Sequence, residues 1–398
     1  MSSQIRKYTF LNIAIALFFL ASPIESISVV ENFSIAKLSA LIVAVAWAAH
    51  RFKYKRSKMI NSFVAMGLYA TASIVWSIDR SVSLSQVLMF LWPSIIVSIA
   101  MYSSIEKNSD IYLYFKFYIL GCIIAAVTTL MFREATLAAA VYEGQDRLTA
   151  FGQDQNTLAF LLCVGFTIVL DCFRRNPSPL LRYFCLALLL LFLVVILSTG
   201  SRTGLLLTFL VFALYFVSSG SFKNFLLIIV LIVFLAPVIY NYIPEGIWDR
   251  FSQTNDLVES GNFSDRGDIW SSGLRAFKDE NFVLGVGYSN FSTMLQKHFG
   301  WSMASHNTYL SYLVDLGCVG FLFFLSILLR MGKIVTNMYK QHKDVYAYAY
   351  FIPFLAMMFS LETEYKRWIF MIGVILESYY RLNSCQLRSN SQTFCINT

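Results

Sequence analysis

Apolar runs close to the length that crosses a bilayer recur along almost the whole chain. A transmembrane helix needs about 20 mostly apolar residues. The 398-residue sequence is 57% hydrophobic and 14% charged, whereas a soluble domain has about 25% charged residues. The sequence therefore predicts an all-α integral membrane protein. The runs predict about twelve transmembrane helices, at residues 9–23, 35–50, 59–78, 84–102, 111–131, 156–172, 181–198, 204–218, 222–241, 307–329, 345–361 and 367–380.

The longest polar stretch, residues 242–305, lies between the ninth and tenth predicted helices. We expect one membrane domain, residues 1–381, that includes this loop, and then a polar cytoplasmic tail at 382–398. A membrane protein does not need such a loop to stay in a bilayer, so we expect it to serve chemistry at the membrane surface.

Two local patterns stand out inside this loop. Trp270, Leu274 and Phe277 recur at i, i+4 and i+7, which is the spacing of one apolar helix face. They predict a short amphipathic helix on the membrane surface, with Asp265 as its N-cap. The glycine-rich segment 284–288 predicts a turn, because no strand-turn-helix pattern surrounds it.

Basic residues gather on one side of the predicted bundle. The clearest loops are His50–Lys58, with five basic residues and no acid, and Arg330–Lys343. The positive-inside rule assigns this side to the cytoplasm and the 242–305 loop to the opposite side. It also accounts for the net charge of +8, so we expect membrane lipids and no nucleic acid as partners.

Four ionisable residues are predicted to share the non-cytoplasmic face: Arg147, Arg202, Arg266 and His306. An arginine fork donates two parallel hydrogen bonds and stays charged, which suits phosphate. Gly200 and Gly204 flank Arg202 and would let a bulky ligand approach the backbone. A histidine is the usual general base near neutral pH. We therefore interpret these residues as a candidate site for chemistry on a phosphate-bearing substrate.

Structural interpretations of the same residues stay open on the sequence alone. Arg202 fits an arginine that snorkels to the interface. Arg147 and Arg266 have aspartates nearby in the sequence for ion pairs, and His306 fits a helix-capping position. The histidines show no metal-ligand spacing, and neither a Walker A motif nor a Ser-His-Asp signature occurs.

Three further segments have simple structural interpretations. His298 is a loop residue with no evident partner in the sequence. Glu362 and Arg367 are expected in a solvated outer loop. Gly317 and Gly320 are three apart in a predicted helix, which favours close helix packing.

Taken together, four motifs in residues 140–325 resemble the O-antigen ligase and polymerase superfamily, which are bacterial inner-membrane glycosyltransferases. The motifs are residues 147–152 (RLTAFG), 198–204 (STGSRTG), 266–270 (RGDIW) and 306–310 (HNTYL). Their order and spacing carry the resemblance, since each motif alone is weak. The family also has a large periplasmic loop between the ninth and tenth helices, where hydropathy predicts one here.

The resemblance implies a fold like that of GT-C-type glycosyltransferases, with the active site facing the periplasm. It implies a metal-independent, inverting transfer, without a cofactor, from an undecaprenyl-diphosphate-linked glycan. The acceptor would be lipid A-core or another lipid-linked repeat unit, in lipopolysaccharide, O-antigen or exopolysaccharide biosynthesis. Arg266 and His306 would be catalytic, and Arg202, Arg147 and Asn307 would bind substrate.

Two other classes of protein remain as alternatives. A transporter or flippase for polyprenyl-linked oligosaccharides would favour charges within the bundle and inverted repeats. This chain instead has its charges at one face and shows no repeat. A membrane scaffold would leave the long loop and the four clustered ionisable residues unexplained.

Overall fold

The computed structural model describes residues 8–30, 33–132, 148–151, 153–176, 178–219, 226, 230, 266–343, 345–362 and 367–396. Its architecture is helical apart from one small antiparallel hairpin, β1 (Ser28–Val30) and β2 (Phe33–Ser34). The helices before the 242–305 segment are α1 (Phe10–Ala21), η1 (Ser22–Ile24), α2 (Ile35–Ala49), α3 (Lys58–Ala72), η2 (Ser73–Val75), α4 (Arg80–Gln86), η3 (Val87–Leu91), α5 (Trp92–Ser104), α6 (Asn108–Met131), α8 (Gln155–Arg175), α9 (Pro179–Ser198) and α10 (Arg202–Ser219). After them come α14 (Arg266–Phe277), α15 (Phe291–Phe299), α16 (Thr308–His342), η4 (Val345–Tyr350), α17 (Ile352–Met357) and α18 (Trp368–Ile396).

Helices in the described part of the chain are long and apolar enough to cross a membrane, which confirms an integral membrane protein. Six meet this condition: Lys58–Val75, Arg80–Ser104, Asn108–Met131, Gln155–Arg175, Pro179–Ser198 and Thr308–His342. Four shorter apolar helices are Phe10–Ile24, Ile35–Ala49, Arg202–Ser218 and Val345–Met357. The total of twelve spans and the position of the large loop stay predictions, because most of 222–241 and all of 242–265 lie outside the described residues.

Several helices begin after a side chain that accepts a hydrogen bond from the backbone of the first turn. Such an N-cap satisfies one of the backbone N–H groups that a helix start leaves unpaired. The capping residues are Thr9, Ser34, Ser57, Asp79, Asp154 and Asn307. Two of them lie at the candidate site: Asp154 caps α8 near Arg266, and Asn307 directly follows His306.

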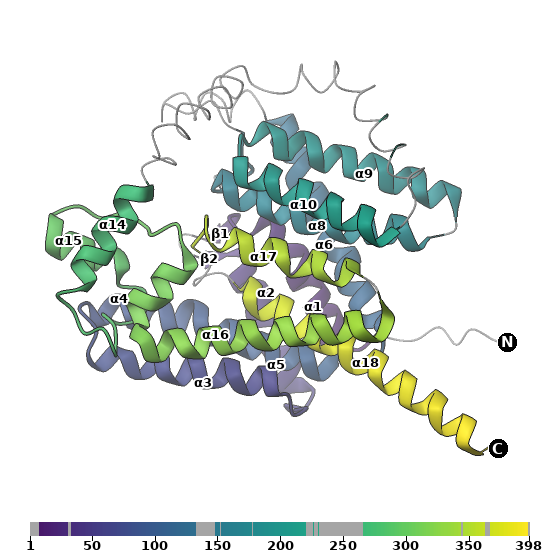
Figure 1. The fold of residues 1–398 in the computed structure, drawn as a ribbon, viewed down its shortest axis with the longest axis horizontal. Coiled ribbons are helices and arrows are strands. Elements are labelled where there is room, and N and C mark those ends of the chain that lie inside the picture. The colour runs from purple at the N-terminus through teal and green to yellow at the C-terminus, as the bar shows by residue number, and fades with distance from the viewer. Residues whose placement is uncertain are drawn as a thin grey trace.

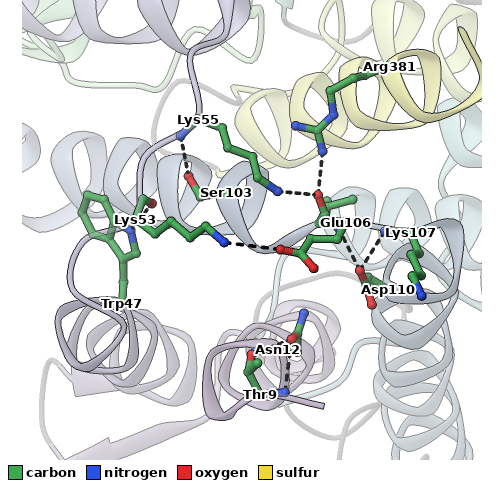
Figure 2. Close-up of polar contacts among 11 residues, drawn as sticks. Thr9, Asn12, Trp47, Lys53, Lys55, Ser103, Glu106, Lys107, Asp110 and Arg381 are labelled. Atoms are coloured by element: carbon green, nitrogen blue, oxygen red, sulfur yellow. Dashed lines mark hydrogen bonds and ion pairs between the residues drawn. The ribbon is translucent and has the colours of Figure 1, made fainter. Parts of the chain in front are cut away.

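One end of the bundle is held by basic side chains (Figure 2). Lys55 Nζ and Arg381 Nη2 both donate to the backbone oxygen of Ile105, at 3.1 and 2.6 Å. Lys53 pairs with Glu106 at 3.5 Å. These contacts join α18 and the segment before α3 to the turn between α5 and α6. They gather basic residues from the predicted cytoplasmic side at one place.

The second basic segment of that side is not a loop. The prediction of a loop at Arg330–Lys343 is wrong, because α16 continues through His342 and ends at Lys343, which has a left-handed backbone. Its C-terminal half keeps an apolar face, with Met331, Ile334, Val335 and Met338 buried. The basic residues in this segment therefore extend a helix rather than interrupt one. In the same way, α18 continues to Ile396 and covers most of the predicted tail, 382–398.

Helices α14 and α15 lie together beside one end of α3 and α16 (Figure 1). Their small apolar core contains Ile269, Phe291 and Leu310. The loop between the two helices is fixed to the bundle by Asp315 of α16, whose carboxylate accepts from the backbone N–H groups of Ser289 and Asn290, both at 3.0 Å. This small unit is therefore a docked part of the molecule.

The predicted turn at 284–288 is confirmed, and it explains a break in α16. Gly285 and Gly287 have φ of +78° and +99°. Gly317 also has a positive φ of 64° with ψ of −170°, so α16 is kinked there. A Cβ at Gly317 would collide with the backbone oxygen of Val283. The expectation of helix packing at Gly317 is therefore wrong, since glycine is needed there for a kink against the turn.

Only part of the predicted apolar face of α14 is buried. Phe277 is buried and Trp270 is half-buried, whereas Leu274 is 46% exposed. Ile269 and Ala276 are buried in its place. The helix packs against two neighbours, α15 and α16, and not against a single flat surface. The buried stripe is therefore shifted by one residue from the stripe that the spacing predicted. The predicted cap, Asp265, lies outside the described residues.

Candidate functional site

The loop that precedes α16 carries His306 in a left-handed backbone conformation, with φ of 48°. His306 is half-buried. Asn307 directly after it is the N-cap of α16, and its Oδ1 accepts from the backbone N–H of Leu310 at 3.1 Å. The helix therefore begins at Thr308, and His306 lies in the turn before it. The sharp turn sets the direction of His306 relative to the helix axis.

Glu362 holds this turn from the other side. Its Oε1 accepts from the backbone N–H of Ser305 at 3.2 Å and from the hydroxyls of Ser305 and Ser311, both at 3.0 Å. The Ser305 hydroxyl also contacts Ser311 at 2.6 Å and the backbone N–H of Asn307 at 3.0 Å. A carboxylate that accepts several hydrogen bonds fixes the groups that donate them. The expectation of a solvated loop at Glu362 is therefore wrong.

Helix α14 is tied to the same turn. The indole Nε1 of Trp270 donates to the backbone oxygen of Ser305 at 2.8 Å. Arg266 is the first residue of this helix, one turn before Trp270. The contact therefore brings the helix that carries the loop arginine against the residue that precedes His306.

Arg266 is half-buried and lies within electrostatic range of Asp154, at the start of α8. Burial lowers the pKa of Arg266, and the negative charge of Asp154 opposes that shift. Asp154 is the N-cap of α8 and accepts from Thr157 N at 2.8 Å. The sequence analysis expected an ion pair between Arg266 and an aspartate close to it in the sequence. The carboxylate that acts on Arg266 is instead Asp154, more than a hundred positions away. A guanidinium stays charged after such a shift, so Arg266 supplies a partly desolvated cation.

The start of α8 in turn contacts the start of α10. Asn156 Oδ1 accepts from the hydroxyl of Ser201 at 2.9 Å, directly before Arg202. Gly200 has φ of +61° in this turn. A Cβ at Gly204 would lie 2.6 Å from Cβ of Ala159, so glycine is what allows α10 to approach α8 this closely. Arg202 is the half-buried first residue of α10.

Three of the predicted site residues, Arg202, Arg266 and His306, thus belong to one end of the bundle. The contacts that join them run through Asp154 and Asn156 on the α10 side and through Trp270 on the His306 side. Asn307 is 8% exposed and uses its side-chain oxygen as a cap. Arg147 lies outside the described residues.

Sequence reasoning missed several residues near this end. Glu362 is 57 positions from Ser305, and no periodic pattern connects them. Arg367 was expected in solvent, but it is 8% exposed with its guanidinium 5.3 Å from the Phe18 ring centre. The positions of both residues depend on long-range packing, and the only signal in the sequence was the apolar run after Arg367.

His298 also has a partner that the sequence did not reveal. Its Nε2 lies 2.8 Å from Glu280 Oε1, and Lys297 Nζ lies 2.6 Å from the same oxygen. Burial of the carboxyl raises the pKa of Glu280, but hydrogen bonds from Lys297 and His298 outweigh it, and the pKa lies below its ordinary value. His298 is therefore part of an ion-pair cluster between α14 and α15.

The segment that contains Arg202, Arg266, His306 and Asn307 also matches a known family. No curated protein matches the chain. The family model described as O-antigen ligase matches residues 186–325, from α9 to the first half of α16. The match confirms the resemblance to the O-antigen ligase and polymerase superfamily that the four motifs carry.

Proposed function

We propose that the protein transfers a glycan from an undecaprenyl-diphosphate donor to an acceptor hydroxyl at the periplasmic face of the inner membrane. The observation that carries the proposal is the joining of α14, which begins at Arg266, to the turn that holds His306, through the Trp270–Ser305 hydrogen bond of 2.8 Å. A cation for the leaving group and a base for the acceptor then belong to one site.

The arginines would bind and stabilise the donor diphosphate. Arg202 and Arg266 are both half-buried, so their charges are less screened than those of arginines in water. Charge that develops on a leaving diphosphate is stabilised by fixed cations at the moment of transfer. Arg147 joins this group as a prediction from the sequence, since the RLTAFG motif ends next to the start of α8.

His306 would take the proton of the acceptor hydroxyl. The acceptor oxygen then forms a bond to the anomeric carbon of the donor sugar. The bond between that carbon and the diphosphate oxygen breaks, and the diphosphate leaves with the electron pair. A single displacement of this kind inverts the anomeric configuration. The proton stays on His306 until it is released to water, so neither a metal ion nor a redox cofactor enters the balance.

Glu362 and Asn307 would act through position. Glu362 fixes Ser305, the residue before His306, by accepting from its backbone and its hydroxyl. Asn307, the residue after His306, is itself fixed as the N-cap of α16. An imidazole held from both sides keeps its direction toward the acceptor, which lowers the entropy cost of reaching the transition state.

The test is transfer by purified protein in liposomes that contain a lipid-linked glycan donor and an acceptor, with chelator present. We expect transfer by the wild type and a loss of about 10²–10³-fold for Arg202→Ala and Arg266→Ala. Arg275→Ala is the matched control, because Arg275 lies exposed on the same helix as Arg266. Full transfer by both site variants, with normal membrane insertion, contradicts the proposal.

Further measurements distinguish a ligase from a polymerase, and either enzyme from a transporter. A ligase attaches glycan to lipid A-core, whereas a polymerase extends a lipid-linked repeat. In cells, a deletion strain of a ligase loses all attached glycan on a lipopolysaccharide gel, and that of a polymerase keeps single repeats. Movement of the donor across the liposome membrane without transfer would instead support the transporter.

A further inference from the structure

A cavity of about 350 Å³ lies between α6, α8, α16 and α18 at the other end of the bundle from the candidate site. Its polar lining includes Asn108, Asp171, Arg175, His342 and Asn383. Arg175 is the last residue of α8, whereas Asp154 caps its first turn. The cavity therefore opens near the basic end of the bundle, where Asn108 directly follows Lys107 of Figure 2.

A second, apolar cavity of about 60 Å³ adjoins the first. Phe115, Tyr350, Ile375 and Leu376 line both cavities, so the two hollows share one wall. The second continues along α8 toward Phe160 and Trp368. A polar mouth that leads into an apolar hollow is the shape that an amphiphile fills, with its head at the mouth and a chain inside.

The mouth has an excess of positive charge. Asp171 accepts from Arg174 at 2.8 Å and from Arg175 at 2.9 Å, so one carboxylate serves two guanidinium groups. The Arg174 guanidinium lies 4.8 Å from the ring centre of Tyr346, which also lines the cavity. A site with one net positive charge favours an anionic head group.

A polar atom at the mouth also needs a partner. Asn108 donates from Nδ2 to Asn383 Oδ1 at 3.3 Å. Its own Oδ1 is buried and has no hydrogen-bond partner among the described residues. A buried carbonyl oxygen without a donor costs about 1–3 kcal/mol. A hydroxyl group on the bound molecule would satisfy it.

The length of α8 decides which leaflet the head group belongs to. Its 21 residues span about 30 Å at about 1.5 Å per residue, which is the thickness of the hydrocarbon core. A head group at Arg175 therefore lies in the leaflet opposite to a diphosphate bound near Arg202. The glycan donor does not fit both places at once, so the cavity is a separate site.

We propose that this cavity binds an anionic glycerophospholipid whose head group carries hydroxyls. The phosphate contacts Arg175, a head-group hydroxyl donates to Asn108, and one acyl chain lies along Phe115, Ile375 and Leu376. The lipid fills the hollow between α6 and α18 and joins these helices to α8 and α16. This binding does not depend on the activity of the site at the other end.

Native mass spectrometry of the purified full-length protein tests the site. The protein is held in nanodiscs of phosphatidylcholine with a small fraction of phosphatidylglycerol and then released into detergent. We expect one phosphatidylglycerol to be retained by the wild type in preference to phosphatidylcholine. Glycerol 3-phosphate should not displace it, because the apolar hollow binds the chain. Equal retention of the two lipids, or displacement by glycerol 3-phosphate, overturns the proposal.

Two variants act on different parts of the site. Arg175→Gln removes the phosphate contact and should weaken retention about tenfold. Ala347→Phe fills the cavity at a wall residue that is 9% exposed, and it should exclude the lipid. Lys53→Gln is the matched control, since it removes one charge at the same end of the bundle outside the cavity. Wild-type retention by both cavity variants, or a loss equal to theirs in Lys53→Gln, overturns the proposal.

Discussion

The indole of Trp270 donates to the backbone oxygen of Ser305 at 2.8 Å, and this bond connects two segments 35 positions apart. One carries Arg266 at its start, and the other leads directly into His306. Trp270→Phe keeps an aromatic ring but removes the indole N–H donor, so the bond that fixes the two segments to each other is lost. We expect a loss of about 1 kcal/mol in stability and a lower rate of glycan transfer. Trp301 stacks on Phe299, so Trp301→Phe is the matched control. Thermal unfolding and the transfer rate are measured for both variants. Equal effects of the two variants on rate would contradict this role.

Glu362 is expected to support the turn before His306 through its charge as well as its shape. Glu362→Gln keeps one acceptor oxygen but removes the negative charge that strengthens the three hydrogen bonds from Ser305 and Ser311. Hydrogen bonds to a charged group contribute about 1.5–3 kcal/mol each, so Glu362→Ala should destabilise more than Glu362→Gln. Thermal unfolding in detergent gives the order. A reversed order, or no loss in either variant, argues against the network.

The cluster of Glu280, Lys297 and His298 predicts an acid sensitivity of the α14–α15 unit. The pKa of Glu280 is lowered from 4.5 by its two partners, after burial has raised it. Its contribution to stability is therefore full above the unfolded value and is lost as the pH falls through the lower folded value. Because Lys297 is 53% exposed, the contribution should be below about 1 kcal/mol. Glu280→Gln should flatten the fall of the unfolding midpoint below pH 4.5. An unchanged slope in the variant would show that the cluster does not stabilise the fold.

The glycine kink of α16 gives a matched pair of substitutions. Gly317 and Gly300 both have positive φ, of 64° and 75°. A Cβ at Gly317 meets backbone atoms of Val283 and Gly285, whereas a Cβ at Gly300 meets nothing within 4 Å. Gly300→Ala should cost about 1–2 kcal/mol from the left-handed backbone alone. Gly317→Ala should cost clearly more, because the backbone has to move. Similar unfolding temperatures for the two variants would mean that the turn at 283–287 yields easily.

Much of the helical framework follows from the apolar runs, because a bilayer requires backbone groups to be satisfied within each segment. The starts of α8 and α16 were predicted within a residue or two, and their caps are polar residues visible in the sequence. Hydropathy failed at Arg330–Lys343, because a basic segment on an amphipathic helix looks like a loop when only its mean polarity is read. It also gave no sign of the kink at Gly317, which depends on a turn that precedes it by about thirty residues.

The candidate site was predictable in its residue types and not in its connections. The motifs that carry Arg202, Arg266 and His306 could be chosen from chemistry and from the resemblance. The groups that hold them, Asp154, Trp270 and Glu362, act through contacts far apart in the sequence. The Leu274 error has the same origin, because a helix that packs against two neighbours buries a different stripe from one that faces a flat surface.

The central claim is that His306 accepts the proton of the acceptor hydroxyl during glycan transfer, and one rate comparison tests it most directly. Single-turnover transfer is measured with saturating lipid-linked donor for the wild type, His306→Ala and His298→Ala. His298 is the matched control, because it is a histidine of the same α14–α16 region whose ring is paired with Glu280 at 2.8 Å. Loss of a general base lowers the rate about 10²–10⁴-fold. We predict that loss for His306→Ala and a near wild-type rate for His298→Ala, whereas an undiminished rate in His306→Ala would contradict the account.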